Sequence, residues 1–226
     1  MAVIQLAGVT KEYAANGTRV RALDDVSIEV RKGEFVSIVG RSGCGKTTLL
    51  NLCGAMDFPT AGRVLIDGID TTNLPDRQLT EIRRSKVGFV FQFFQLLPTL
   101  SAVENVELPL LLAGQMSSRP LALERLDWVE MSSFADRLPH QLSGGQMQRV
   151  AIARALVHSP QVLLADEPFG NLDSTSAEIV MNLLRRIARE LDTSILMATH
   201  STEAAQMTDT IVQLRDGRIE EIRRLS

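Results

Sequence analysis

The feature that most constrains the fold is a glycine-rich segment at residues 40–47, which reads Gly-Arg-Ser-Gly-Cys-Gly-Lys-Thr. It fits the phosphate-binding pattern G-x-x-x-x-G-K-[ST]. An apolar run at residues 35–39 precedes it and a helix-like run at residues 47–53 follows it, which is the strand–loop–helix setting that the pattern requires. Such a loop turns backbone N–H groups and a helix N-terminus toward phosphates. We expect Lys46 to reach the outer phosphates and the Thr47 hydroxyl to hold magnesium.

A second glycine-rich turn, Leu-Ser-Gly-Gly-Gln, lies at residues 142–146, and Met-Gln-Arg-Val-Ala-Ile-Ala-Arg-Ala follows it at 147–155. Taken alone, it reads as a helix start capped by Ser143 or as an anion-binding turn. The first loop alone leaves kinases, GTPases, helicases and transporter ATPases open. The two loops together resemble the signature of ABC-transporter ATPases, and the resemblance covers essentially the whole chain. A simple P-loop kinase would leave residues 142–146 unexplained.

The order of apolar runs indicates the fold class. Strand-like runs at residues 26–30, 162–165 and 195–198 alternate with helix-like segments, a pattern typical of an α/β core with a mostly parallel sheet. Residues 211–222 read as a terminal hairpin around Asp216 and Gly217. With the resemblance, this predicts a P-loop NTPase core with an N-terminal antiparallel β part and an inserted helical subdomain. We expect one domain, 1–226, with a catalytic core at 1–92 and 159–226 and a helical subdomain at 93–158.

Two carboxylates, Asp166 and Glu167, directly follow the apolar run at residues 162–165. Side chains at the C-terminal ends of buried parallel strands lie where α/β proteins bind ligands. We therefore expect Asp166 to hold magnesium through water and Glu167 to polarise the attacking water as a general base. Without the resemblance, the pair reads equally well as an acidic turn before Pro168.

The resemblance implies further contacts around ATP and Mg²⁺. Gln92 would touch magnesium and the attacking water, and His200 would hydrogen-bond the γ-phosphate. Tyr13, the only tyrosine, would stack on adenine; its alternative is a partly exposed position near a turn at residues 16–17. The resemblance implies that the nucleotide contacts Tyr13, Gly40, Arg41, Ser42, Gly43, Cys44, Gly45, Lys46, Thr47, Thr48, Ser143, Gly144, Gly145, Gln146 and Asp173. The implied catalytic residues are Glu167, His200, Gln92 and Lys46. The implied metal ligands are Thr47, Gln92 and Asp166.

Composition limits the kinds of partner and the cellular compartment that we expect for this chain. A net charge of −3 gives no basic excess that would favour nucleic acid. The two cysteines, Cys44 and Cys53, fit no zinc or thioredoxin spacing, and reduced thiols in the cytoplasm suit them best. Because Cys44 lies at a helix N-terminus beside Lys46, we expect it to be the more reactive thiol. No signal-peptide pattern and no run of roughly 18 apolar residues is evident, so we expect any membrane pathway to belong to another polypeptide.

Residues 91–110 resemble one subgroup of the family, the ATPases of lipoprotein release, macrolide efflux, haem or peptide export, and cell-division regulation. This implies a separate integral-membrane permease, a second copy paired head to tail, and a peripheral place on the cytoplasmic face of the membrane. In such a pair, residues 143–146 and Asp173 would face the second subunit. Export or membrane extraction is the leading function, and mechanical signalling through the permease is the alternative. The apolar residues after Gln92 form either a permease groove or the subdomain's own core.

Overall fold

The computed structural model describes residues 1–15, 18–116 and 118–225. Its strands are β1 (Ala2–Ala15), β2 (Thr18–Arg31), β3 (Phe35–Val39), β4 (Ala61–Ile66), β5 (Ile69–Asp70), β6 (Val87–Phe91), β7 (Val162–Asp166), β8 (Ser194–Thr199), β9 (Thr210–Arg215) and β10 (Arg218–Arg224). Its helices are α1 (Lys46–Cys53), α2 (Asp76–Lys86), α3 (Ala102–Leu112), α4 (Arg119–Trp128), α5 (Gly144–Leu156), α6 (Ser174–Glu190) and α7 (Thr202–Ala205). None of the helices in this described part of the chain is long and apolar enough to span a bilayer.

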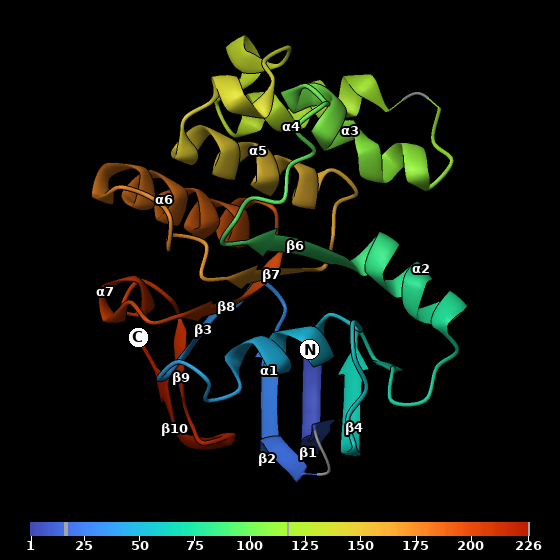
Figure 1. Ribbon diagram of the computed structural model, residues 1–226, viewed down its shortest axis with the longest axis vertical. Helices are drawn as coiled ribbons and strands as arrows, with labels where there is room; N and C mark the ends of the chain where they lie inside the picture. Colours follow the sequence, from blue (N-terminus) through green and yellow to red (C-terminus); the bar gives the residue numbers. More distant parts are fainter. Residues whose placement is uncertain (16–17, 117, 226) are drawn as a thin grey trace.

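A mostly parallel sheet forms the centre of the molecule, in the order β10-β9-β3-β8-β7-β6. Strands β9, β3, β8, β7 and β6 pair in parallel, and only β10 is antiparallel to its neighbour. Every residue of β8 is buried, as expected for a strand covered on both faces. Figure 1 shows α5 and α6 on one side of this sheet and α1 on the other. The predicted sheet and its terminal hairpin are confirmed.

Alternate residues of β7 enter two separate hydrophobic cores. Leu163 and Ala165 join a core shared with the helices α3 to α6, whereas Val162 and Leu164 join a core shared with α1 and the N-terminal strands. This division follows from the alternation of side chains along a strand. The strand is thus anchored on both faces, which fixes the position of the residues at its C-terminal end.

The N-terminal strands form a second, antiparallel sheet in the order β2-β1-β4-β5. It lies on the far side of α1 from the parallel sheet (Figure 1), so that α1 is enclosed between the two sheets. This confirms the N-terminal antiparallel part that the family resemblance implied.

A helical layer covers the remaining side of the parallel sheet and contains α3, α4 and α5, with short 3₁₀ turns at Ser132–Phe134 and Pro139–Gln141. Helix α3 begins with a capping box, because Ser101 and Glu104 each accept from the other's backbone N–H. The described residues of 93–158 include no strand, as expected for a helical subdomain. Its boundaries at 92/93 and 158/159 stay a prediction.

Candidate active site

The first glycine-rich segment connects β3 to α1 and depends on two close backbone approaches. Gly45 has φ 108° and is the N-cap of α1, and a Cβ placed on it would lie 2.5 Å from the carbonyl oxygen of Ala22. A Cβ on Gly40 would collide with the carbonyl oxygen of Leu214 on β9. Both positions therefore require glycine for packing, and Gly45 also requires it for its left-handed backbone.

The N-terminus of α1 is open to an anion. The helix has no side-chain cap and no acidic residue in its first turn, so its first N–H groups are left for another acceptor. The Lys46 ammonium lies beside them, donating to the carbonyl oxygens of Gly40 at 2.9 Å and Arg41 at 3.3 Å. Its side chain is only 9% exposed. Backbone amides and a held cation together suit the phosphates of a nucleotide.

Thr47 and Asp166 meet across the interior of the site. The Thr47 hydroxyl donates to Oδ2 of Asp166 at 2.9 Å, although 119 residues separate them. Burial raises the pKa of Asp166; the Thr47 hydrogen bond lowers it, and the neighbouring Glu167 raises it again. A half-buried carboxylate beside a second carboxylate and a hydroxyl is a fitting place for a divalent cation.

The described residues contain no cluster of three or more His, Cys, Asp or Glu side chains that could hold a metal by themselves. A cation at Thr47 and Asp166 would therefore take its remaining ligands from water and from phosphate oxygens. Mg²⁺ has this habit, because it keeps several waters and binds through one or two protein ligands together with substrate phosphates. The donor set present thus fits Mg²⁺ held jointly with a nucleotide.

Glu167 and His200 come together because β7 and β8 are parallel neighbours. Asp166 pairs with Ala198 in the strand register, so the residues that follow each strand meet at the same edge. The His200 ring nitrogen Nδ1 lies 2.8 Å from Oε2 of Glu167. The other carboxylate oxygen, Oε1, lies 4.0 Å from Nζ of Lys46. This arrangement places a carboxylate between an imidazole and an ammonium.

Gln92 lies directly after β6 and beside the loop that follows Glu167. Its carbonyl oxygen accepts from the Asn171 side chain at 3.0 Å, and a Cβ on Gly170 would lie 2.5 Å from its Nε2. Among the described residues, no hydrogen bond joins the Gln92 side chain to Thr47 or Asp166. The structure therefore brings Gln92 to the adjoining loop and not into contact with that pair.

Tyr13 lies on β1 next to α1. Its hydroxyl donates to Oδ2 of Asp57 at 2.8 Å, and the Lys11 ammonium lies 4.8 Å from the ring centroid. Burial and Asp57 raise the pKa of Tyr13, and a hydrogen bond with Thr48 of α1 lowers it. The ring is 38% exposed, which leaves it accessible to a planar ligand. The turn expected at residues 16–17 lies outside the described residues.

The second glycine-rich turn starts α5 on the opposite side of the parallel sheet from α1 (Figure 1). Ser143 and Gln146 form a capping box: the Ser143 N–H donates to Oε1 of Gln146 at 2.8 Å, and the Gln146 N–H donates to Oγ of Ser143 at 3.3 Å. A Cβ on Gly144 would lie 3.4 Å from Leu172. In the described chain, no hydrogen bond links this turn to residues 40–48. One chain thus presents two separate glycine-rich turns, each at the start of a helix.

Asp173 caps α6, since its Oδ1 accepts from the Ser176 N–H at 2.9 Å. The N-cap of α6 is therefore Asp173, and Ser174 is the first residue of the helix. It lies two residues beyond Asn171, on the loop that also contacts Gly144.

A sequence family described as ABC transporter matches residues 23–170, which is more than half of the chain. The chain belongs to the ABC transporter family. This ABC ATP-binding subunit is 48% identical over 224 residues to an uncharacterised ABC transporter ATP-binding protein of Methanocaldococcus jannaschii, with 96% of this chain and 95% of that protein covered. A dimeric structure of that protein, in a post-hydrolysis state bound to ADP and Pi, matches with a TM-score of 0.91 at 46% identity and covers 99% of each chain.

Two further relatives of this ABC subunit have more specific names. It is 42% identical to the lipoprotein-releasing system ATP-binding protein LolD of Colwellia psychrerythraea, over 96% of this chain and 85% of LolD. It is 44% identical to the macrolide export ATP-binding/permease protein MacB of Syntrophobacter fumaroxidans, over 97% of this chain but only 31% of MacB. The ABC chain therefore spans most of the length of this LolD protein and about a third of the length of MacB.

Cys44 is expected to be the more reactive of the two thiols, and this order stays a prediction, although the structure buries the side chain of Cys44. Its side chain is only 6% exposed, and its Sγ lies 2.6 Å from where a Cβ on Gly40 would be. It lines a hollow together with Arg41 of the loop and with Leu214 and Asp216 of the β9–β10 hairpin. Cys53 is fully buried, and burial raises the pKa of its thiol.

Sequence reasoning missed three polar side chains that tie the loops of the ABC site together: Asn105 on α3, and Gln148 and Arg154 on α5. Asn105 and Gln148 are fully buried, and all three hydrogen-bond backbone groups of loops. A signal was present for Arg154, because it interrupts an otherwise apolar run at residues 150–157. Buried polar residues of this kind need partners, and the partners are found only in the fold.

Proposed function

We propose that the chain is a Mg²⁺-dependent ATPase that drives export or membrane extraction of a substrate through a separate permease. The observation that carries the proposal is the convergence of Lys46, Thr47–Asp166 and Glu167–His200 beside the open N-terminus of α1. Hydrolysis of a phosphoanhydride needs backbone amides and a cation to bind the phosphates, oxygen ligands to hold a metal, and a carboxylate to activate water.

Each side chain has a task that follows from its contacts. Lys46 offsets negative charge on the outer phosphates, which an ammonium at a helix N-terminus is placed to do. Thr47 and Asp166 would hold Mg²⁺, which, when bound, neutralises charge on the phosphate oxygens. Glu167 accepts the proton of the attacking water, and His200 orients that carboxylate through Oε2. Gln92, on the neighbouring loop, would contact Mg²⁺ and the attacking water.

The proposal includes a head-to-tail pair in which residues 143–146 of one chain face the nucleotide of the other. Two observations support it. Helix α5, which this turn starts, lies on the opposite side of the parallel sheet from α1 (Figure 1), and in the described residues no hydrogen bond joins the turn to residues 40–48. The relative from Methanocaldococcus jannaschii, 46% identical in the structural match, forms a dimer in its ADP- and Pi-bound structure.

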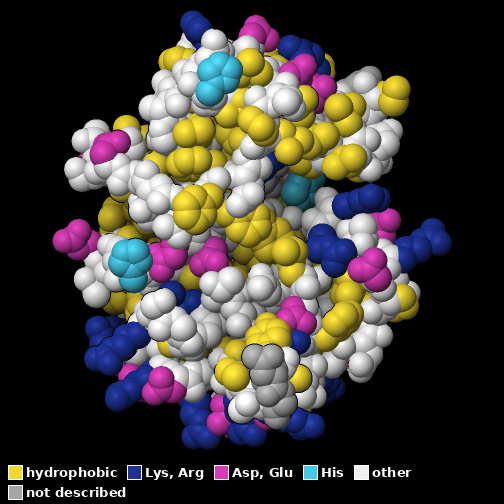
Figure 2. Space-filling model, in the orientation of Figure 1, with side chains coloured by type: hydrophobic (Ala, Val, Ile, Leu, Met, Phe, Trp, Pro, Cys, Tyr) yellow, Lys and Arg dark blue, Asp and Glu magenta, His cyan; other side chains and the backbone are white. Residues whose placement is uncertain are grey.

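A permease partner is supported by the relatives and by the surface. LolD belongs by name to a lipoprotein-releasing system, and MacB is named as an ATP-binding/permease protein. Figure 2 shows hydrophobic side chains gathered over the upper, helical part of the face. In and near the segment after Gln92, Phe93 is 67% exposed and Leu97 is 44% exposed, whereas Leu96 packs on the helical core. We assign the exposed members to a permease contact and place the subunit peripherally on the cytoplasmic side of the membrane.

The test is ATP hydrolysis by the purified chain with Mg²⁺ or with EDTA, beside Lys46→Ala as the matched inactive variant. We expect phosphate release that needs Mg²⁺ and that Lys46→Ala abolishes, because the variant loses the cation that faces the phosphates. Copurification from native membranes should then identify the permease. Transport by the reconstituted pair would separate export from mechanical signalling. Absence of hydrolysis with every permease recovered would contradict the proposal.

A further inference from the structure

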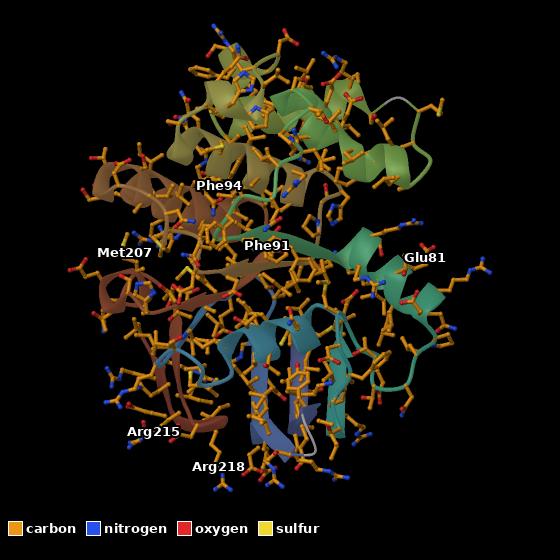
Figure 3. All side chains as sticks on the ribbon, in the orientation of Figure 1. Glu81, Phe91, Phe94, Met207, Arg215 and Arg218 are labelled. Carbon is orange, nitrogen blue, oxygen red and sulfur yellow. The ribbon has the colours of Figure 1, made fainter. Side chains whose placement is uncertain are left out.

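The segment that follows Gln92 has an unusual backbone. Phe94 has φ 57° and Gln95 has φ 53°, so two consecutive residues other than glycine adopt the left-handed conformation. The Gln95 N–H donates to the carbonyl oxygen of Phe93, and the Phe94 N–H donates to that of Phe91 at 3.3 Å. Such a backbone persists only where the surroundings determine it. Figure 3 shows Phe91 on β6 and Phe94 nearer the helical layer.

The guanidinium group of Arg154, on α5, holds this backbone in place. Its guanidinium donates through Nη2 to the carbonyl oxygen of Phe94 at 2.9 Å and through Nη1 to that of Gln95 at 2.5 Å. The two N–H groups therefore hold two successive carbonyls in the fixed fork geometry of arginine. Within the described ranges, no carboxylate lies within 4 Å of Arg154, and burial lowers its pKa. The two carbonyls are thus the principal partners of a largely desolvated charge.

The same helix also holds the residue just before Gln92. Gln148 is fully buried, and its Nε2 donates to the carbonyl oxygens of Phe91 at 3.3 Å and Pro168 at 2.8 Å. Pro168 directly follows Glu167, so this one side chain ties the strand end before Gln92 to the turn after the carboxylates. Gln92 therefore lies between a Gln148 contact on one side and the Arg154 fork on the other.

We propose that Arg154 is a positioning residue for ATP hydrolysis, which fixes the backbone at Phe94 and Gln95 and thereby the placement of Gln92. The proposal rests on the function proposed above for Gln92. Arg154 lies eleven residues after Ser143, about 16 Å along the helix at 1.5 Å per residue. A displacement of α5 by a molecule bound at Ser143 would therefore be carried by Arg154 to the segment beside Gln92.

Arg149 provides a matched control on the same helix. Its Nη1 donates to the carbonyl oxygens of Val129 at 3.4 Å and Glu130 at 3.5 Å, and Glu130 also has a left-handed backbone, with φ 60°. Arg149 thus also donates to carbonyl oxygens of a left-handed turn, in the helical layer and away from Gln92, and in addition lies 3.8 Å from the exposed Glu130 carboxylate. Arg149→Met and Arg154→Met remove the same chemical group from one helix.

The first arm of the test is amide hydrogen exchange of the nucleotide-free chain. We expect Arg154→Met to speed exchange at Phe94 and Gln95 roughly tenfold, since the hydrogen bonds that fix their turn are lost, and to leave residues 129–132 unchanged. Arg149→Met should show the reverse pattern. If Arg154→Met is too unstable to purify, Arg154→Lys keeps the stem and charge but cannot form the fork. Unchanged exchange at Phe94 and Gln95 would overturn the proposal.

The second arm is kinetic and uses a double-mutant cycle with Gln92→Ala. We expect Arg154→Met to lower kcat by about 10–100-fold, as misplacement of a reacting group does, with the KM for ATP changed less than about twofold. In the Gln92→Ala background, Arg154→Met should lower kcat no further. Arg149→Met should leave kcat unchanged. An equal loss in both backgrounds would show that Arg154 does not act through Gln92. If the wild-type chain hydrolyses no ATP, the proposed function fails, and the exchange arm still decides whether Arg154 fixes the segment.

Discussion

The backbone N–H and the ring Nδ1 of His200 both face a single oxygen of Glu167, Oε2, at 3.2 and 2.8 Å. Glu167 itself has a left-handed backbone, with φ 46°, and its N–H donates to the carbonyl oxygen of Ala198 at 2.9 Å. The carboxylate is thus oriented by the end of the neighbouring strand. Its second oxygen, Oε1, accepts no hydrogen bond within the described ranges and lies 4.0 Å from Nζ of Lys46.

Glu167→Gln should therefore slow ATP turnover by roughly 10²–10⁴, the usual contribution of a positioned general base. Binding of ATP should persist, because Lys46 and the amides of α1 are unchanged. Single-turnover hydrolysis and the affinity for a fluorescent ATP analogue measure the two effects separately. Wild-type turnover in Glu167→Gln would remove Glu167 from the catalytic role.

Asp166→Asn should raise the stability of the nucleotide-free chain at neutral pH. Since the folded state raises the pKa of Asp166, mainly through burial, the folded chain binds a proton more readily than the unfolded chain. The free energy of unfolding therefore falls as the pH rises from the pKa of Asp166 in the unfolded chain to its pKa in the folded chain. Above the folded pKa this loss of stability is complete. We expect a Tm increase of about 2 °C at pH 7, small because the carboxyl is partly exposed to solvent.

Thermal unfolding between pH 4 and 8 tests this, and the gain of Asp166→Asn should shrink as the pH falls. Asp173→Asn is the control of opposite sign, because hydrogen bonds from Ser176 lower the pKa of Asp173. That carboxylate stabilises the fold above its unfolded pKa and loses the effect as pH falls through its folded pKa. Equal behaviour of the two variants would show that burial at Asp166 is not the cause.

The head-to-tail pair can be trapped. Glu167→Gln with saturating ATP should elute as a dimer, since nucleotide would bridge both faces while hydrolysis is slow. Adding Ser143→Arg, which places a large side chain in the second turn, should return the protein to monomer. Ser143→Ala is the matched control and should cost about 1 kcal/mol through loss of the cap without blocking the face. Light scattering distinguishes the states, and dimerisation of the Ser143→Arg form would refute the arrangement.

Both thiols should resist alkylation in the native protein. Cys44 is turned toward the β9–β10 hairpin and Cys53 is in the core. We expect maleimide to modify less than one thiol per chain over the time in which denatured protein reacts completely, with no change on adding ATP. Peptide mapping identifies the modified residue. Rapid modification of Cys44 in the native chain, prevented by ATP, would show that its side chain does face the nucleotide.

The sequence predicted the parallel sheet and the phosphate loop because both depend on local signals. Apolar runs mark β3, β7 and β8, and the glycine spacing marks the turn before α1. It predicted only residues 26–30 of β2, which begins at Thr18. The missing part is mostly exposed, with Leu23 as its one buried residue, and it is held as a strand by pairing with β1. Such pairing overrides local propensity.

The candidate site also contains some residues that local sequence signals predict and others whose placement depends on long-range contacts. Asp166, Glu167 and His200 follow predicted strands, so their meeting at one edge follows from the topology. The direction of Cys44 could not be predicted, because it depends on the approach of Leu214 from a strand about 170 residues away. Neither could the contacts of Arg154, whose partners are backbone carbonyls that carry no sequence signal. The roles of the individual site residues stay predictions until the variants above are measured.

The capping box at Ser143 and Gln146 has a kinetic consequence. Because each residue satisfies the other's backbone N–H within a single chain, the turn is already rigid before a partner arrives, and little entropy remains to be lost on docking. Association of two chains at this face should then proceed as a rigid-body encounter, at about 10⁵–10⁷ M⁻¹s⁻¹. Differences in the stability of the pair would then come mainly from its dissociation rate. The release of nucleotide or phosphate from the site would limit that rate.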